Sequence, residues 1–600
     1  MLCVLYVNSK EPNCGAYQFG RAISVALSKS AKFHFSYCEI DSLQALAEAV
    51  DASRPAAIIY NYLPSTMPWL KQRPIAAIDG PQIGTIHEIT QAVADSATDG
   101  LFDFHIAADP TLLLKNPIVF KTGRLLASYR NTFPSPRQPV IGTWGFGYAG
   151  KGFDQVVRVV QQEFDEATIR LHIPISPFMD PQGAQSAEIA ARCRALIVKP
   201  GVELIVTHEF LSHGAMLDFL AQNSLNAFFY AEHLSRGVSS VLDMALAVDR
   251  PLALTKSLMF RHLFDARPSI FIEDRSLREI IASGIEPLQR YKSEWTAENL
   301  TWDYERIVTK ALDAYRRKSP PGLVSSIKGK LRGQRLKLAK TLAERYAKKA
   351  ARLERKGGGP WITETTELGY RPRVVAPVKV DLEVRPAGER RYNRILDDAA
   401  RRMYAPIIAL LYSLAPEVMD RKIAEANVQQ AFVFDAVRTL APANARILCV
   451  GSFEDTASIA LKVMGFAVEE IDPVINYDLD EFITRPSTVK ESYDILFATS
   501  VLEHIDDDET FMRHLSDLLK PGGVAILTCD YNDQYKQGDS IPSVCHRMYT
   551  QKDFRERIIP SAVQCAPIDP PDWNCPNPDF VLVGRYRYTF ATLVLRKSAS

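Results

Sequence analysis

The sequence is poor in cysteine, in net charge and in long apolar runs. Its nine cysteines among 600 residues are scattered without a Cys-x-x-Cys pair, which excludes a disulfide framework and a structural zinc site. Cys545, Cys565 and Cys575 lie near His546 without the spacing of a ligand set, and no His-Glu-x-x-His motif occurs, so we predict no metal site. A net charge of +1 argues against a nucleic-acid-binding protein. No apolar run has the length of a membrane span.

The remaining composition is ordinary for a globular protein, with 47% apolar and 24% charged residues. A length of 600 residues predicts about three domains. The first residues, MLCVLYVNSKEP, lack a basic region and indicate a first strand instead of a signal peptide. We therefore expect a cytoplasmic protein.

The segment from Arg446 to Asp530 has the clearest pattern. An apolar strand, ILCV, stops at Gly451, a helical pattern follows, and a second strand ends at Asp472. The run YDILFATSVLEHI predicts another strand with Ser500–His504 just past its end, and a Pro-Gly-Gly turn precedes the strand VAILTCD. Alternating strands and helices predict a parallel sheet, whose carboxyl strand ends collect ligand-binding residues. The glycine lets a ligand approach the backbone, and the carboxylate can accept hydrogen bonds from two ribose hydroxyls. Together they indicate that a nucleoside binds here.

This segment resembles the class I S-adenosyl-L-methionine-dependent methyltransferases through ILCVG, EEIDP, YDILFATSVLEH and LLKPGGVAILT. It departs from them at Phe453 and Asp455, where further glycines are usual, and at Cys449, where an acidic residue is usual. The resemblance implies S-adenosyl-L-methionine as cofactor, bound by Gly451, Asp472, Asp480 and Ser500. The alternative is a methyltransferase fold kept for structure alone.

Methyl transfer to a hydroxyl group requires a base as well as alignment. His504 is the preferred candidate for this base, and Asp530 and His546 are the next. All three follow or end predicted strands of the methyltransferase-like segment, which we place in a domain at residues 389–600.

Residues 1–136 and 137–305 predict two further α/β units. In the second, the loop of GTWGFGYAGKGFD joins a strand to a helix and carries Lys151, which suits a phosphate. Further on, Ser239 and Ser240 stand at the predicted start of a helix beside Arg236 and Gly237, again suited to an anion.

These units resemble the GT-B glycosyltransferases of the family 4 type through CGAYQFGRA, IHE, GKGFD and SRGVSSVLDMALAVDRPL. The resemblance implies a nucleotide sugar between the units. It assigns the diphosphate to Lys151, Arg236, Ser239 and Ser240, the donor ribose or sugar to Asp243, and an acceptor or donor sugar to His87. The family's two glutamates, eight residues apart, fall on Ser235 and Asp243. Because Ser235 is not acidic, an inactive carbohydrate-binding module is the alternative.

Residues 306–388 predict a basic helical and extended linker. From Arg316 to Lys356 there are fifteen Lys or Arg and two Glu, so residues 328–356 could lie on an anionic membrane surface. A solvated helix or a flexible tether explains the same pattern.

The predicted architecture is thus α/β throughout: two Rossmann-like units of a GT-B fold, the linker, and a Rossmann-like methyltransferase domain. We predict a bifunctional enzyme that extends and methylates a surface polysaccharide or glycolipid glycan, with no nucleic-acid partner. One alternative is a methyltransferase whose N-terminal module only binds carbohydrate. Another is a methyltransferase for a small molecule or lipid, with an unrelated nucleotide bound at the N-terminal module.

Overall fold

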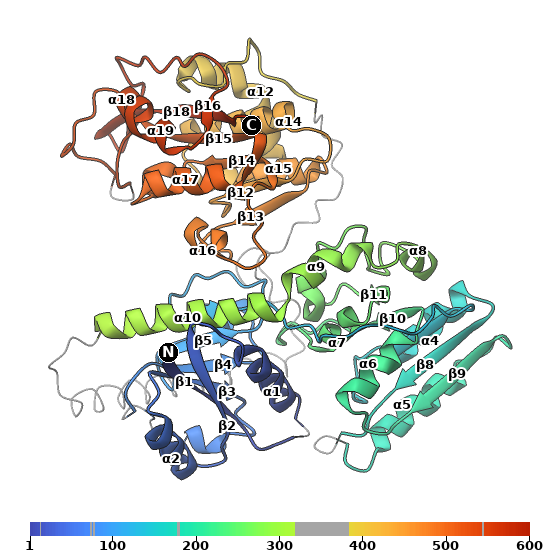
Figure 1. Ribbon diagram of the computed structural model, residues 1–600. Helices are drawn as coiled ribbons and strands as arrows, with labels where there is room; N and C mark the ends of the chain where they lie inside the picture. Colours follow the sequence, from blue (N-terminus) through green and yellow to red (C-terminus); the bar gives the residue numbers. More distant parts are fainter. Residues whose placement is uncertain are drawn as a thin grey trace. The chain divides into compact units, whose positions relative to one another are not determined.

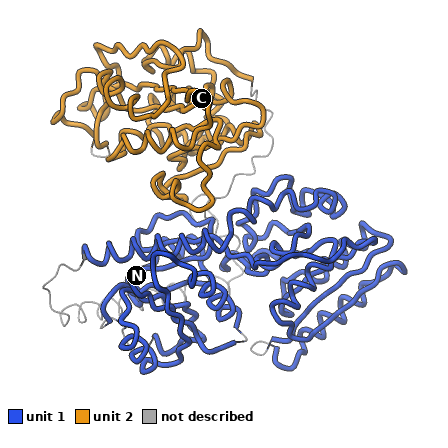
Figure 2. Tube along the Cα trace, viewed as in Figure 1, with its two compact units in different colours: residues 1–372 blue, residues 373–600 orange. Residues whose placement is uncertain are grey.

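The computed structural model describes residues 1–12, 14–71, 75, 78–176, 180–318, 383–542 and 545–599. The chain divides into two compact units, residues 1–372 and 373–600 (Figure 2). Both units are built on α/β sheets whose central strands run parallel, which confirms the predicted fold class. The predicted basic membrane-contact segment, 328–356, lies outside the described residues.

The first sheet of the N-terminal unit has the order β2-β1-β3-β4-β5-β6, with all pairs parallel (Figure 1). Its central strands are apolar runs buried on both faces, as a parallel sheet covered by helices requires. The strands are β1 (Leu2–Asn8), β2 (Phe33–Glu39), β3 (Ala57–Tyr62), β4 (Gln82–Ile86), β5 (Phe104–Ala107) and β6 (Val119–Lys121). The helices are α1 (Gly15–Leu27), α2 (Leu43–Ser53), η1 (Pro68–Lys71) and α3 (Gln91–Asp95).

The second sheet of this unit has the order β11-β10-β7-β8-β9 and is also parallel. Its strands are β7 (Val140–Trp144), β8 (Ala167–His172), β9 (Val202–Thr207), β10 (Leu225–Phe228) and β11 (Leu252–Leu254). Its helices are α4 (Phe153–Glu163), α5 (Ala184–Ala195), α6 (His213–Ala221), α7 (Val241–Ala247), η3 (Leu258–Leu263), α8 (Leu277–Ala282), η4 (Glu286–Leu288) and α9 (Gln289–Glu294).

The long helix α10 (Ala297–Lys318) brings the chain back to the first sheet (Figure 1). Its apolar face, including Ile307, Val308 and Leu312, is buried in one cluster with Val4 and Tyr6 of β1. The Thr301 hydroxyl donates to the Ala26 carbonyl at the end of α1, 3.1 Å away. The predicted division at residue 305 therefore falls inside a helix that serves the first sheet.

The sheet of the C-terminal unit has the order β13-β12-β14-β15-β18-β16, and β17 pairs with β18. The first four strands are parallel and β18 is antiparallel to β15. The strands are β12 (Ile447–Val450), β13 (Val468–Ile471), β14 (Tyr493–Thr499), β15 (Leu519–Tyr531), β16 (Cys565–Pro567), β17 (Phe580–Leu582) and β18 (Tyr586–Lys597).

The helices of this unit cover both faces of its sheet. They are α12 (Asp398–Leu414), α13 (Pro416–Arg421), η5 (Ala424–Ala426), α14 (Asn427–Leu440), α15 (Thr456–Val463), α16 (Leu479–Ile483), η6 (Leu502–His504), α17 (Asp508–Leu518), α18 (Gln551–Asp553), the π-helical η7 (Phe554–Ile558) and α19 (Ile559–Ser561). The buried α14 contacts β14 and β15. Among the described residues, no helix is both long and apolar enough to span a membrane.

Two local predictions need correction. The Pro-Gly-Gly sequence does not form a separate turn but an irregular stretch within β15, because Tyr493 pairs with Leu519 whereas Ile495 pairs with Val524. The sequence RRYNRILDDAARRMYAPIIALLYSL suggests a helical lead-in from about Glu389, but the helix begins only at Asp398. Before it, Arg394 and Ile395 form isolated bridges with Asp572 and Ala591, so this stretch is extended.

Candidate active sites

The carboxyl ends of β12, β13 and β14 meet at one edge of the C-terminal sheet. The Gly451 amide donates to the Ile471 carbonyl at 2.9 Å. The Asp472 carboxylate accepts from the Phe453 amide at 3.2 Å and from the Val474 amide at 2.7 Å, so it joins the loops that follow β12 and β13. Burial raises the pKa of Asp472, and these two amides oppose that shift. The edge predicted to hold a nucleoside therefore exists as a connected set of loops.

Gly451 and Val501 determine how closely the loops after β12 and β14 approach. Gly451 has a φ of +76°, and a Cβ there would lie 2.4 Å from Val501 Cγ2. Ser500 has a φ of +57°, which is uncommon for a non-glycine residue. Its amide donates to the Thr528 carbonyl and hydroxyl, each at 3.1 Å, which attaches this turn to β15. Ser500 thus lies with Gly451 and Asp472, as predicted.

Lys422 is a cation at this edge that the sequence analysis did not single out. It follows α13, and burial lowers the pKa of its ammonium group, whereas the nearby Asp455 and Glu454 carboxylates oppose that shift. Asp455 is buried and caps α15 by accepting from the Ser458 amide at 2.7 Å. A lysine that directly follows an amphipathic helix is the only signal the sequence offers for this cation.

Asp530, near the end of β15, and Glu503, in the turn after β14, are two buried carboxyl groups at the same edge of the sheet. Glu503 lies in η6, has 0% exposure, and accepts at Oε1 from the Ser500 hydroxyl at 2.6 Å. Asp530, one of the predicted bases, is 5% exposed near the end of β15, and the Cys545 thiol donates to its Oδ2 at 3.6 Å. Burial raises the pKa of both carboxyl groups, and Glu503 raises that of Asp530 further. Glu503 was not predicted, although an acidic residue directly after the apolar pair Val501 and Leu502 was a usable signal.

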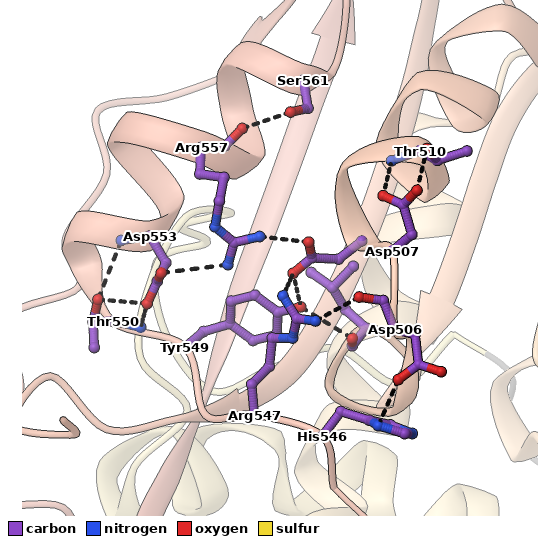
Figure 3. A network of polar contacts seen from close by, with 12 residues as sticks. Asp506, Asp507, Thr510, His546, Arg547, Tyr549, Thr550, Asp553, Arg557 and Ser561 are labelled. Carbon is purple, nitrogen blue, oxygen red and sulfur yellow. Dashed lines mark hydrogen bonds and ion pairs between the residues drawn. The ribbon is translucent and has the colours of Figure 1, made fainter. Parts of the chain in front are cut away.

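The other candidates of this unit are more exposed. His504 lies at the exposed end of η6. His546 forms an ion pair with Asp506 at 2.7 Å, and Figure 3 shows this pair at the margin of a polar network. Asp480, with 76% of its side chain exposed, pairs with His514 of α17 at 3.1 Å. Asp480 and His546 are therefore each engaged in an ion pair, with His514 and Asp506 respectively.

In the N-terminal unit, the glycine-rich loop after β7 surrounds Lys151 and Tyr230. The Lys151 ammonium lies over the Tyr230 ring, 3.9 Å from its centre. A Cβ on Gly145, whose φ is +152°, would lie 3.6 Å from the Tyr230 hydroxyl. Burial lowers the pKa of Lys151 to about 8, and the nearby Arg236 contributes. No ion pair or hydrogen bond joins this ammonium to another residue in the described part of the chain.

Loops of the two N-terminal sheets meet beside this cation. Arg236, from the loop before α7, pairs with Glu88, which follows β4. A Cβ on Gly237 would lie 2.9 Å from the His87 carbonyl oxygen, so a glycine is required for the close approach. Arg261 adds bonds to the Ile89 carbonyl at 3.2 Å and to Asp109. His87 and Arg236, predicted on separate motifs, are therefore neighbours.

His87 and Asp243 lie around one buried arginine. Arg124, which follows β6, donates from Nε to Asp243 at 2.9 Å and also pairs with it through a second nitrogen. Burial lowers the pKa of His87 to about 4, and Arg124 adds to that effect, so the imidazole is neutral at pH 7. Its Nε2 is buried without a partner among the described residues. Arg124 carried no signal in the sequence, because its partner lies 119 residues away, in a helix of the other sheet of the N-terminal unit.

Ser239 and Ser240 lie at the start of α7, as predicted. Ser240 is its exposed N-cap residue and makes no capping bond with its side chain. The Ser239 amide donates to the Met259 carbonyl at 2.9 Å, so that amide is already used. Burial raises the pKa of the Tyr230 phenol, and the Ser239 side chain opposes this shift, which places Ser239 beside the Lys151 site.

The two units of the chain are similar to different groups of known proteins. A family model described as "Methyltransferase domain" matches residues 423–556. The C-terminal unit contains a methyltransferase domain. The match includes the strand ends at Gly451, Asp472 and Ser500, and it confirms the resemblance seen in the sequence. A search of curated protein sequences gives no match.

Solved structures similar to the N-terminal half are glycosyltransferases and related enzymes. A glycosyltransferase from Rickettsia africae ESF-5 is 9% identical, with 54% of this chain and 99% of that chain covered and a TM-score of 0.37. Sucrose-phosphate synthase from Thermosynechococcus elongatus is 12% identical, with 53% and 99% covered and a TM-score of 0.38. HepE of Anabaena, in complex with UDP, is 14% identical, with 57% and 100% covered and a TM-score of 0.33. These likenesses concern the fold alone.

Proposed function

We propose that the C-terminal unit binds S-adenosyl-L-methionine and methylates a hydroxyl group. The observation that carries this proposal is the Asp472 carboxylate, which joins the loops after β12 and β13 next to Gly451. The cofactor carries ribose hydroxyls, a carboxylate and an ammonium group. Asp472 can accept from the hydroxyls, and Lys422 can pair with the carboxylate. When bound, the cofactor supplies a methyl group on a positively charged sulfur.

Calorimetry of the full chain with S-adenosyl-L-methionine tests this proposal. We expect binding of one equivalent, and weaker binding after Lys422→Ala. Lys552→Ala is the matched control, because that lysine is exposed and pairs with the exposed Glu556 of the next turn. A folded protein that releases no heat with the cofactor and is not stabilised by it would contradict the proposal.

We further propose that the N-terminal unit binds a nucleoside diphosphate sugar. Lys151 carries this proposal, because its half-buried ammonium has no anionic partner among the described residues and lies near Arg236. The first amides of α4, directly after this loop, lack partners within the helix and suit a phosphate. The unpartnered Nε2 of His87 can bond a sugar hydroxyl. Ser239 and Ser240 complete the proposed diphosphate site.

A second function for this unit, a carbohydrate-binding scaffold, rests on specific observations. Ser235 is exposed and cannot supply a carboxylate, and the Asp243 carboxylate is already paired with Arg124. If Arg124 keeps this partner, Asp243 is not available to a donor ribose. Binding without transfer is then the expected result.

A thermal-shift screen of the full chain with UDP-, GDP-, ADP- and dTDP-sugars separates the two functions. An enzyme should be stabilised by one of them, lose this effect after Lys151→Ala and after Arg236→Ala, and hydrolyse or transfer the sugar. Lys10→Ala, at an exposed ion pair with Asp41, is the control. Stabilisation by free glycans with no response to any nucleotide would favour the scaffold.

Both activities on one chain suit one product, a surface polysaccharide or glycolipid glycan that is extended and then methylated on the cytoplasmic side. Contact of residues 328–356 with the membrane belongs to this proposal. Vesicles with anionic lipid should retain the protein at low salt and release it as salt rises, whereas neutral vesicles should not retain it. Equal retention by both kinds of vesicle would favour the tether.

A further inference from the structure

Glu503 and Asp530 form a buried acidic pair, and no lysine or arginine in the described part of the chain forms an ion pair with either carboxylate. Glu503 Oε1 accepts from the Ser500 hydroxyl at 2.6 Å, and its Oε2 is buried without a hydrogen-bond partner in the described part of the chain. Carboxylates that serve only to hold a fold are normally saturated with donors. This pair is not, which separates it from the structural acids nearby.

Asp508 shows what a structural acid looks like in the same region. Its carboxylate accepts from Arg547 at 2.8 Å and from the Tyr549 hydroxyl at 2.7 Å, and it also pairs with Arg557. Figure 3 shows Arg547, Tyr549 and Arg557 converging within this network. Arg547 and Arg557 are therefore engaged by Asp508, and in the described part of the chain neither forms an ion pair with Glu503 or Asp530.

One short segment holds the acidic pair together. The His546 amide donates to the Glu503 carbonyl at 2.8 Å, and the Cys545 thiol contacts Asp530. The Tyr549 amide donates to the Asp530 carbonyl at 3.2 Å, and its hydroxyl donates to the Leu502 carbonyl at 3.0 Å. Because 545–549 is bonded to both η6 and β15, the two carboxylates cannot move apart independently.

The surroundings favour one proton on this pair. Burial raises the pKa of Glu503, which His504 opposes, and burial with Glu503 raises the pKa of Asp530 well above its usual value. The other titratable groups that face the pair are Cys529, Cys545 and Tyr588, and their own pKa values are raised, so they are neutral at pH 7. Two adjacent carboxylates in such a site do not both ionise near neutral pH.

We propose that Asp530 takes the proton from the hydroxyl group of the methyl acceptor and that Glu503, sharing one proton with it, is its positioning residue. Asp530 keeps slight exposure and Glu503 has none, so only Asp530 can be reached by an acceptor. This rests on the proposed methyltransferase function. The hydroxyl oxygen loses its proton to Asp530 as its lone pair takes the methyl group, and the broken bond's electron pair stays on sulfur.

The pair also selects the acceptor's chemical class. A hydroxyl group is too weak an acid to ionise by itself, so it needs a base stronger than an ordinary carboxylate. A carboxylate acceptor would be repelled by this buried acidic pair. Hydroxyl acceptors, such as those of a glycan, therefore fit this site better than carboxylates.

The test uses the full chain, labelled S-adenosyl-L-methionine and methyl glycosides of common hexoses as hydroxyl probes. Asp530→Asn should lower the methylation rate about 100-fold or more, the usual worth of a general base, with cofactor affinity changed less than about threefold. Glu503→Gln should move the rising limb of the pH–rate profile to lower pH, because Asp530 loses its like-charged neighbour. Cys545→Ala should move it to higher pH, because Asp530 loses a donor.

The free energy of unfolding, measured as a function of pH, tests the acidic pair without any methyl transfer. Acids whose pKa is raised by folding bind more protons in the folded state, so stability falls as the pH rises above the ordinary carboxyl pKa of about 4 and through the raised pKa values of the pair. Glu503→Gln and Asp530→Asn should each reduce this fall, and the double variant should reduce it most. Both amides remove a buried charge, so the variants are expected to fold at pH 8.

Each outcome separates this inference from the proposed function. An Asp530→Asn protein that methylates at the normal rate, or a Glu503→Gln protein whose rate falls equally at every pH, overturns the inference alone. A wild-type protein that is folded and does not bind the cofactor overturns the proposed function and this inference with it.

Discussion

Arg124 holds the Asp243 carboxylate with two guanidinium nitrogen atoms, although 119 residues separate them in sequence. Their side chains are 4% and 14% exposed, so the pair is nearly removed from water. Arg124 follows β6 of the first sheet, whereas Asp243 lies in α7 of the second. The pair therefore joins the two sheets of the N-terminal unit at the position where the sequence placed a donor-binding carboxylate.

Breaking this pair should destabilise the N-terminal unit. Asp243→Ala leaves the Arg124 charge buried, which we expect to lower the free energy of unfolding by about 3–5 kcal/mol. Replacing both residues, Arg124→Met with Asp243→Leu, should cost less, because no buried charge remains. Urea unfolding of the full chain measures both. Lys10→Ala is the matched control, since that exposed pair should be worth about 1 kcal/mol or less. Equal effects at the two pairs would contradict the prediction.

Binding of an anionic nucleotide should depend on pH through Lys151. With a pKa of about 8, its ammonium is charged at pH 7 and loses its proton as the pH rises to 9. Affinity should therefore fall across this range. Lys151→Arg should remove the dependence, because arginine stays protonated throughout. Calorimetry at several pH values measures this, and a pH-independent affinity in the wild type would place the nucleotide away from Lys151.

Asp472→Ala should weaken binding of S-adenosyl-L-methionine by roughly 1–3 kcal/mol, the cost of leaving buried donors unpaired. It also frees the Phe453 and Val474 amides, so the loops after β12 and β13 should exchange amide hydrogens faster. Asp480→Ala is the comparison, because that side chain pairs with His514 and is 76% exposed. A larger loss of affinity at Asp480 would instead support the assignment of that residue to the cofactor that the resemblance implies.

Gly451→Ala should destabilise the C-terminal unit for two reasons that can be separated. The positive φ costs an alanine about 1–2 kcal/mol, and the new Cβ would collide with Val501. Adding Val501→Ala should relieve the collision and leave the cost of the backbone conformation. Thermal unfolding of the single and double variants measures both parts. If the second substitution restores nothing, the loops have moved apart in solution.

The strand ends could be predicted from sequence because their signals are local. Gly451, Asp472 and Ser500 each directly follow a strand of four to seven residues, so the sheet topology alone brings them together. Lys151 and Arg236 were found in the same way, from glycine-containing loops before helices. Their shared surroundings at Tyr230 are a consequence of the same parallel topology.

Residues whose role depends on distant partners were not found. Nothing around Arg124 indicates that its partner is Asp243, and part of the raised pKa of Asp530 comes from Glu503, 27 positions before it. The Pro-Gly-Gly sequence is a turn by composition, yet here it is an irregular part of β15, because pairing with β14 continues on both sides of it. Local chemistry predicts where a strand ends but not which charges burial will bring together.

The return of α10 to the first sheet sets an order for synthesis on the ribosome. The cluster that contains Val4 and Tyr6 is completed by Ile307, Val308 and Leu312, which are made only after the whole second sheet. Until then, the nascent first sheet carries an uncovered apolar face. The second sheet, whose strands are contiguous in sequence, can close earlier. Release of a chain that stops at residue 305 would therefore yield an aggregation-prone intermediate, and a recombinant N-terminal fragment needs to extend past Lys318.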